Sequence, residues 1–202
     1  MLNFLFPTAV YSDEDPSFVD IANKWFNKAK FYNGPRQSPK LRTTLVVEGY
    51  TPGGAPVTFD PSQEPEWPGW NQFVSYHVRQ YLNEQRYKPY GIQLVNTWLN
   101  EVEAGGMQGP HDHTGYNLSG VYYPQVPEGS GRLLFHSDKD KGKAFLHGID
   151  VDTPATCPNW WIPVKTGTVL IFSSDVVHSV PILEFEGVRR SIAFDVVLKW
   201  QG

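Results

Sequence analysis

Cysteine is almost absent from this sequence, and long apolar runs are missing altogether. The single cysteine, Cys157, cannot form a disulfide within the chain, which is typical of a reducing compartment. No segment approaches the roughly 18 consecutive apolar residues of a transmembrane helix, and the short apolar start, residues 1–7, lacks the basic residues of a signal peptide. We therefore expect a soluble, cytoplasmic protein without a membrane span.

Clustered charge of one sign is also lacking. The net charge is −4 at pH 7, and no run of five or more basic residues occurs. Because nucleic-acid binding usually needs clustered Lys and Arg, nucleic acid is a disfavoured partner. A protein side chain or a small metabolite fits this composition better as the substrate, whose identity the sequence does not give. Aromatic residues reach 14%, and if some are exposed they leave a homodimer open.

Turn-forming residues are plentiful instead, with 18 Gly and 17 Pro among 202 residues. They favour short strands separated by turns. Apolar residues at helical spacing predict one helix that begins within 13–17 and ends near 32–35, and a second over about 70–86. Strand-like patterns occupy residues 43–48, 92–103, 118–123, 131–137, 160–164, 168–172, 176–180 and 190–200.

These patterns predict one domain over residues 1–202 that is mainly β with flanking helices. The helices lie mainly in 13–87 and the β core mainly in 91–200. Short antiparallel strands in this number indicate a sandwich or barrel of the jelly-roll type.

A histidine pair stands out in the β region. Residues 111–113 read His-Asp-His, and alternate side chains of an extended segment share one face. His178 follows on a later strand. Non-haem Fe(II) sites use three protein ligands, commonly two histidines and a carboxylate, and leave other positions open. We predict His111, His113 and His178 as the metal ligands, with no catalytic residue beyond them.

The middle residue of this motif is an alternative ligand. An acid is expected two residues after His111, but His113 occupies that position. Asp112 leaves the opposite face of an extended chain, where it is an outer partner or a surface group. If the segment turns, Asp112 reaches the metal in place of His113, and the sequence leaves both arrangements open.

A basic strand near the end of the chain offers an anchor for a carboxylate. Alternation puts Arg189 and Ser191 on one face, and an arginine can bind a carboxylate through two parallel hydrogen bonds. We predict that these two residues bind a dicarboxylate co-substrate. Candidate helpers in the same pocket are Tyr122 and Asn117, with Tyr123 and Ser119 beside them.

In their order, these motifs resemble the 2-oxoglutarate (2OG) and Fe(II)-dependent oxygenase superfamily. More narrowly, the chain is similar to a family of such oxygenases that is common in bacteria and phages. The matching segments are residues 5–9, 96–100, 111–113, 118–123, 167–172, 178–180 and 189–194.

The resemblance implies a double-stranded β-helix, the cupin-like jelly roll, as a single 2OG-Fe(II) oxygenase domain. It also implies Fe(II) on the three histidines and 2OG on Arg189 and Ser191. The implied reaction hydroxylates an unidentified substrate and releases succinate and CO2. Because His113 replaces a carboxylate, a different oxidative outcome stays open.

Two other functions fit the same residues. One is a three-histidine, cupin-like dioxygenase that uses no 2OG and gives Arg189 no co-substrate role. The other is a non-enzymatic jelly-roll module that binds sugars on its aromatic side chains.

Overall fold

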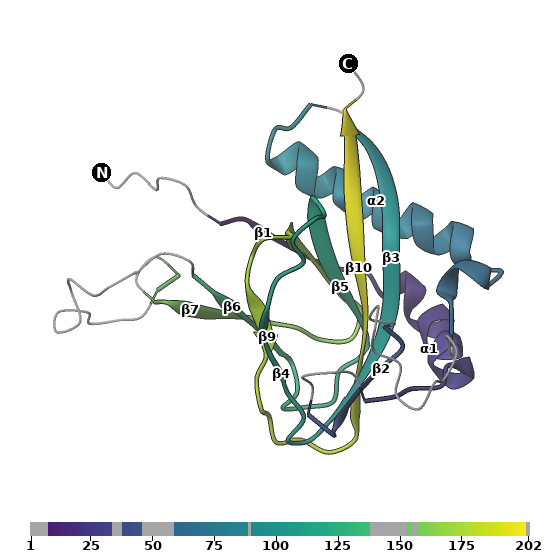
Figure 1. Ribbon diagram of the computed structural model, residues 1–202, viewed down its shortest axis with the longest axis vertical. Coiled ribbons are helices and arrows are strands. Elements are labelled where there is room, and N and C mark those ends of the chain that lie inside the picture. Colours follow the sequence, from purple (N-terminus) through teal and green to yellow (C-terminus); the bar gives the residue numbers. More distant parts are fainter. Residues whose placement is uncertain are drawn as a thin grey trace, which may run out of the picture.

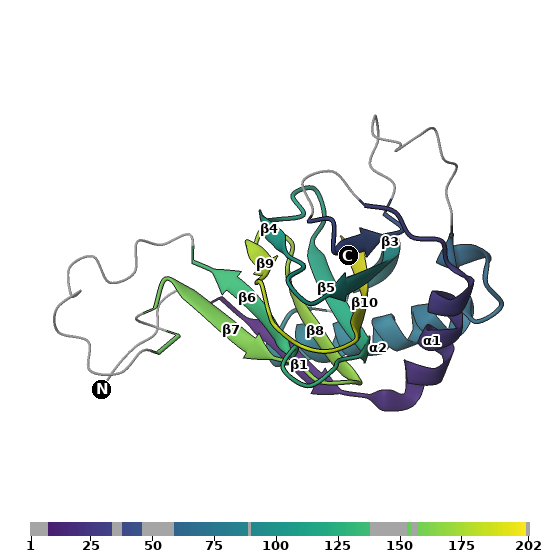
Figure 2. The same ribbon diagram turned by 90° about the horizontal axis from the view of Figure 1, so that it is seen from below.

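The computed structural model describes residues 8–33, 38–45, 59–88, 90–137, 153–154 and 157–200. Two antiparallel sheets pack face to face, and two helices cover the outer face of the larger one (Figures 1 and 2). The mainly β, jelly-roll class predicted from the sequence is confirmed. No helix in these ranges is both long and apolar enough to span a membrane.

The larger sheet has six strands, and its neighbours are mostly far apart in sequence. Their order is β1 (Val10–Glu14), β8 (Thr168–Ser173), β5 (Leu118–Gln125), β10 (Val188–Trp200), β3 (Tyr90–Glu103) and β2 (Leu41–Thr43). The smaller sheet has the order β4 (Gln108–His111), β9 (His178–Val180), β6 (Arg132–His136) and β7 (Asn159–Pro163). The β6–β7 pair extends away from the rest of the fold (Figure 1).

The helices are α1 (Val19–Lys28) and α2 (Trp67–Glu84), each preceded by a 3-10 turn, Pro16–Phe18 and Pro61–Gln63. An aspartate accepts a backbone N–H at the start of each 3-10 turn, which favours a helical start. The buried stripes of α1 and α2 include Trp25 and Trp70, which pack with one another and with the outer face of the larger sheet. This core covers the face of the larger sheet that points away from the smaller sheet.

A second apolar cluster fills the space between the sheets. Strand β5 is buried on both faces, so its alternate residues serve different cores. Tyr122 belongs to the helix side, whereas Val121 and Tyr123 belong to the space between the sheets. The functional pocket opens beside this second cluster.

Some predicted boundaries differ from the structure. The first helix ends at Lys28 rather than near 32–35, because Ala29 already has extended backbone angles. The second helix begins at Trp67 and ends at Glu84. Strand β2 (Leu41–Thr43) precedes most of the predicted 43–48, of which 46–48 lie outside the described residues, as do residues 1–7. The sequence patterns missed β1 and β4 altogether.

Candidate metal centre

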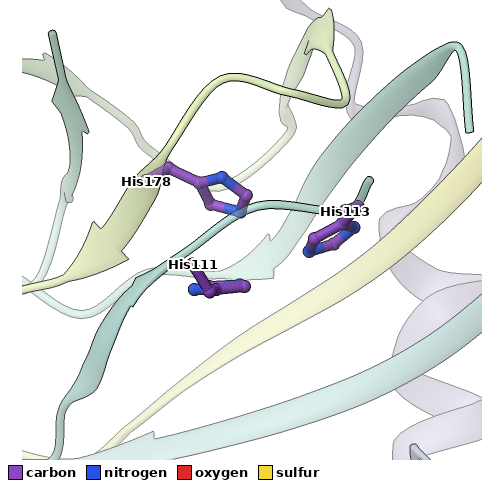
Figure 3. A group of neighbouring side chains, drawn as sticks. All are labelled: His111, His113 and His178. Atoms are coloured by element: carbon purple, nitrogen blue, oxygen red, sulfur yellow. The ribbon is translucent and has the colours of Figure 1, made fainter. Parts of the chain in front are cut away.

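Three histidines converge where the smaller sheet faces the larger one. His111 ends β4 and His178 begins β9, and the two are direct partners in the strand pairing. His113 follows two residues after β4, and its backbone N–H donates to the Ser174 carbonyl at 2.8 Å. One ring nitrogen from each histidine lies within 4.8 Å of the others. Figure 3 shows the three rings turned toward a common point.

The Nδ1 atom of each of the three rings lies next to a hydrogen-bond acceptor. The Nδ1 atoms of His111 and His178 each lie 3.0 Å from a backbone carbonyl, of Gly109 and Val176 respectively. The Nδ1 of His113 lies 2.7 Å from a carboxylate oxygen of Asp195. A carbonyl only accepts, so Nδ1 carries the proton and Nε2 keeps its lone pair for a metal. The Gln108 amide lies 3.3 Å from Nε2 of His111.

Burial favours the neutral form of His111 and His178. It lowers the pKa of His178 to about 3, and the neighbouring His111 adds to the effect. Burial also lowers the pKa of His111 below its usual range. Because only the neutral imidazole can coordinate, the two rings are ready to bind a cation without first losing a proton.

Asp112 takes no part in this cluster. It is exposed, and its Oδ1 accepts from the backbone N–H of Thr114 at 3.2 Å and from its hydroxyl at 2.7 Å. These bonds hold the pKa of the Asp112 carboxyl below its usual range. Of the two arrangements that the sequence leaves open, the structure has the one in which His113 faces the cluster.

Arg189 is the second element of the pocket. Its side chain is buried, and one guanidinium nitrogen donates to the Tyr123 hydroxyl at 3.1 Å. The other two nitrogens, Nε and Nη1, have no hydrogen-bond partner, and no described carboxylate forms an ion pair with them. A buried cation without a counter-charge is costly, so this geometry suits an anionic ligand.

The neighbouring arginine shows the contrast. Arg190 lies on the opposite face of β10, where its Nε donates to Glu101 at 3.1 Å and Nη1 to Asn23 at 3.3 Å. Its charge is therefore satisfied within the fold. Of the two adjacent arginines, Arg189 is the one available to a ligand.

The three histidines, Arg189 and Ser191 line the same pocket, as the sequence suggested. Asn100, the strand partner of Ser191, also lines it, and its buried Oδ1 lacks a hydrogen-bond partner. Apolar side chains complete the wall: Leu45, Trp98, Val121, Leu133, Phe172, Val180 and Ala193.

Two predicted helpers lie elsewhere. Tyr122 faces the helices, where its ring contacts Trp70 and its hydroxyl donates to the Asp15 carbonyl. Asn117 is exposed, and its Oδ1 accepts from the backbone of Leu198. Tyr123 lines the pocket instead, because successive strand residues point to opposite faces.

Asp195 is the residue of this centre that sequence reasoning missed. It is 3% exposed and contacts His113 directly. A signal was present: Asp195 continues the alternation of Arg189, Ser191 and Ala193 on the inner face of β10.

Comparisons with known proteins agree with this geometry. The family model described as "Putative 2OG-Fe(II) oxygenase" matches residues 96–195, which span the histidines and Arg189. A comparison with curated protein sequences found no match.

Solved structures share the fold at low sequence identity. An oxidoreductase of the 2OG-Fe(II) oxygenase family from Burkholderia pseudomallei has 12% identity and a TM-score of 0.58, covering 89% of this chain and 77% of its own. HygX from Streptomyces hygroscopicus, with nickel and 2-oxoglutarate bound, has 11% sequence identity and a TM-score of 0.59. The match covers 94% of this chain and 83% of HygX. A prolyl-4-hydroxylase from Pseudomonas putida has 10% sequence identity and a TM-score of 0.57. The match covers 94% of this chain and 92% of the hydroxylase.

The motif order, the jelly-roll sheets and the match to the family model lead to one assignment. This chain belongs to the 2OG-Fe(II) oxygenase family.

Proposed function

We propose that this protein is an Fe(II)- and 2OG-dependent dioxygenase in which His111, His113 and His178 hold the metal. Arg189 and Ser191 bind the distal carboxylate of 2OG, and the Tyr123 hydroxyl positions the guanidinium. One observation carries the proposal: a single pocket is lined both by three converging imidazoles and by a buried arginine without a charged partner.

The donor set fits the cofactor. Neutral imidazole nitrogen is a suitable ligand for Fe(II), and three protein ligands leave positions open for 2OG and O2. Fe(II) held by these imidazoles would supply O2 activation, in which oxidative decarboxylation of 2OG to succinate and CO2 takes up one oxygen atom and hydroxylation of a substrate C–H bond takes up the other.

The chain's own residues supply binding and shielding. The unpartnered Nε and Nη1 of Arg189 are free to donate to a carboxylate. The Ser191 hydroxyl adds a further donor to that carboxylate, and the Asn100 side-chain oxygen can accept from a bound water molecule. The apolar wall around them, which includes Phe172 and Leu133, limits access of water to the reacting groups.

The substrate class is a protein side chain or a small metabolite. Similar solved structures support both kinds, because they include a prolyl-4-hydroxylase and HygX with hygromycin B bound. A charged nucleic acid fits less well with a net charge of −4.

Replacing Arg189 separates this function from a three-histidine dioxygenase that does not use 2OG. We expect Arg189→Ala to weaken 2OG binding by about 10- to 100-fold, because charged hydrogen bonds are lost, while Fe(II) still binds. Arg79→Ala, at an exposed arginine on α2, is the matched control. Anaerobic calorimetry measures both ligands. Unchanged 2OG affinity in Arg189→Ala, or no 2OG binding by the unaltered protein, contradicts the proposal.

A further inference from the structure

We propose that Asp195 is the positioning residue of the metal centre. Its buried carboxylate orients the His113 ring so that Nε2 points toward the metal. It also places a negative charge one hydrogen bond away from a ligand set of three imidazoles, which carries no negative charge itself. This inference rests on the proposed function, because it presupposes that His113 binds the metal.

The carboxylate is held from several sides. His113 Nδ1 lies 2.7 Å from Oδ1, and the Ser119 hydroxyl donates to the same oxygen at 2.8 Å. The Asn96 amide donates to Oδ2 at 3.2 Å and, with its other hydrogen, to the Tyr116 hydroxyl at 2.8 Å. With donors on both oxygens and 3% exposure, the carboxylate is fixed in place and directed at one ring.

The strand register explains this aim. Asn96 and Ser119 are the direct cross-strand partners of Asp195 on β3 and β5. The pairing of β10 with β3 shifts by one residue just after Asp195, so Val95 has no partner. A bulge of this kind redirects side chains at a functional site. It lies next to the residue that meets His113.

The other two histidines are oriented differently. The rings of His111 and His178 are held by carbonyls two residues before them, in their own segments. His113 follows the end of β4, and the hydrogen-bond partner of its Nδ1 is a side chain that lies 82 positions later. His113 is therefore the ligand whose orientation depends on tertiary structure.

The charge has a consequence for the metal. A histidine that donates to a carboxylate is a more basic ligand than one that donates to a carbonyl, and loss of such a partner typically lowers metal affinity about 10- to 100-fold. In the usual ligand set a carboxylate binds the metal itself. Here His113 occupies that position, and the carboxylate stands directly behind it.

Two variants separate the charge from the packing. Asp195→Asn keeps the size and an oxygen for His113, but it turns an amide toward the Asn96 amide. The exchange variant, Asn96→Asp with Asp195→Asn, restores a carboxylate–amide pair while moving the charge away from His113. Asp112→Asn is the matched control, because it removes an exposed carboxylate between two of the ligands.

The readouts are anaerobic Co(II) titration and the metal-induced shift in melting temperature, alongside the melting temperature of each metal-free protein. We expect both Asp195 variants to bind Co(II) at least about tenfold more weakly, with Asp112→Asn unchanged. If Asp195 is only structural, the metal-free proteins melt lower but Co(II) affinity stays within twofold, and the inference is overturned. Failure of the unaltered protein to bind Co(II) or Fe(II) instead overturns the proposed function.

Discussion

Tyr122 and Tyr123 are neighbours on β5 that serve opposite sides of the larger sheet. Tyr122 is packed against α2 and donates to the Asp15 carbonyl, whereas Tyr123 contacts Arg189 through both its hydroxyl and its ring, 4.9 Å from the guanidinium. One step along a strand thus decides whether a tyrosine stabilises the fold or the pocket.

This difference gives a matched pair of substitutions. We expect Tyr123→Phe to weaken 2OG binding roughly fivefold, because Arg189 loses a hydrogen bond worth about 1 kcal/mol. Tyr122→Phe has the reverse profile: it lowers the free energy of unfolding by about 1 kcal/mol and leaves 2OG affinity unchanged. Calorimetry and urea unfolding of both variants test this, and equal 2OG affinities for the two would contradict the placement of the pocket.

Buried histidines contribute to the pH dependence of stability. Folding lowers the pKa of His178 to about 3, whereas in the unfolded chain it is about 6.5. As pH falls through 6.5, His178 therefore binds a proton in the unfolded state but not in the folded state. The contribution of His178 to the free energy of unfolding is therefore fully present above about pH 6.5. It declines toward pH 3, by at most about 1.4 kcal/mol per pH unit.

Burial also lowers the pKa of His111 and of His77, so they act in the same direction. His178→Gln isolates one contribution. For the metal-free proteins, we expect the free energy of unfolding to fall less steeply below about pH 6.5 in this variant than in the unaltered chain. Urea unfolding at several pH values measures both slopes, and equal slopes would show that His178 is not held neutral.

At the scale of single elements, β5 is the strand on which both cores depend. Gly120 lies within the buried run of β5, two residues before Tyr122 and opposite Phe194 on β10. A Cβ at this position would stand 2.2 Å from the Phe194 ring and 2.8 Å from the Leu170 carbonyl. Close approach of β5 to these groups therefore requires glycine.

We expect Gly120→Ala to lower the free energy of unfolding by about 1–3 kcal/mol, since the core must shift to admit one methyl group. Gly109→Ala on β4 is the control, because nothing lies within 4 Å of the added Cβ. Thermal or urea unfolding compares them. Equal stability of the two variants would contradict the packing of β5 against β10.

Elements with strong internal patterns could be predicted from sequence, whereas the edge strands β1 and β4 could not. Alternation located β3, β5, β8 and β10, and helical spacing located α1 and α2. Strand β1 was missed because only Tyr11 of its five residues is buried, so its polar end resembles a helix start. Strand β4 contains Gly-Pro, and its pairing with β9 gives it a structure that its own residues do not favour.

The same distinction holds for the site. The order of the three histidines could be predicted from the His-Asp-His motif and the later His178. The strand face on which Arg189 lies could be predicted from the alternation of side chains along the strand. The unmet hydrogen bonds of Arg189 and the contact from Asp195 depend on which strands are neighbours in space, and the bulge beside Asp195 has no local signature.

For the molecule as a whole, the cluster of three histidines connects the two sheets. His111 and His178 belong to the smaller sheet, whereas His113 is tied through its ring to Asp195 on β10 of the larger one. A metal held by all three histidines would therefore restrain the sheets relative to each other.

We expect metal binding to stabilise the whole protein. At a free metal concentration about 100 times the dissociation constant, the gain is about 2.7 kcal/mol, or roughly 5–10 °C in melting temperature. Amide hydrogen exchange is expected to slow in β4 and β9 of the smaller sheet, which carry His111 and His178, and also in β10 of the larger sheet near Asp195, and less in α1. Protection confined to one sheet would indicate that His113 does not bind the metal.

The most direct measurement for the central claim is anaerobic Fe(II) binding by the purified protein, with metal content determined per chain. We expect one Fe(II) per chain in the unaltered protein, greatly weakened binding in His111→Ala, His113→Ala and His178→Ala, and no change in Asp112→Ala. Undiminished Fe(II) binding in any of the three histidine variants, or its loss in Asp112→Ala, would contradict the three-histidine centre.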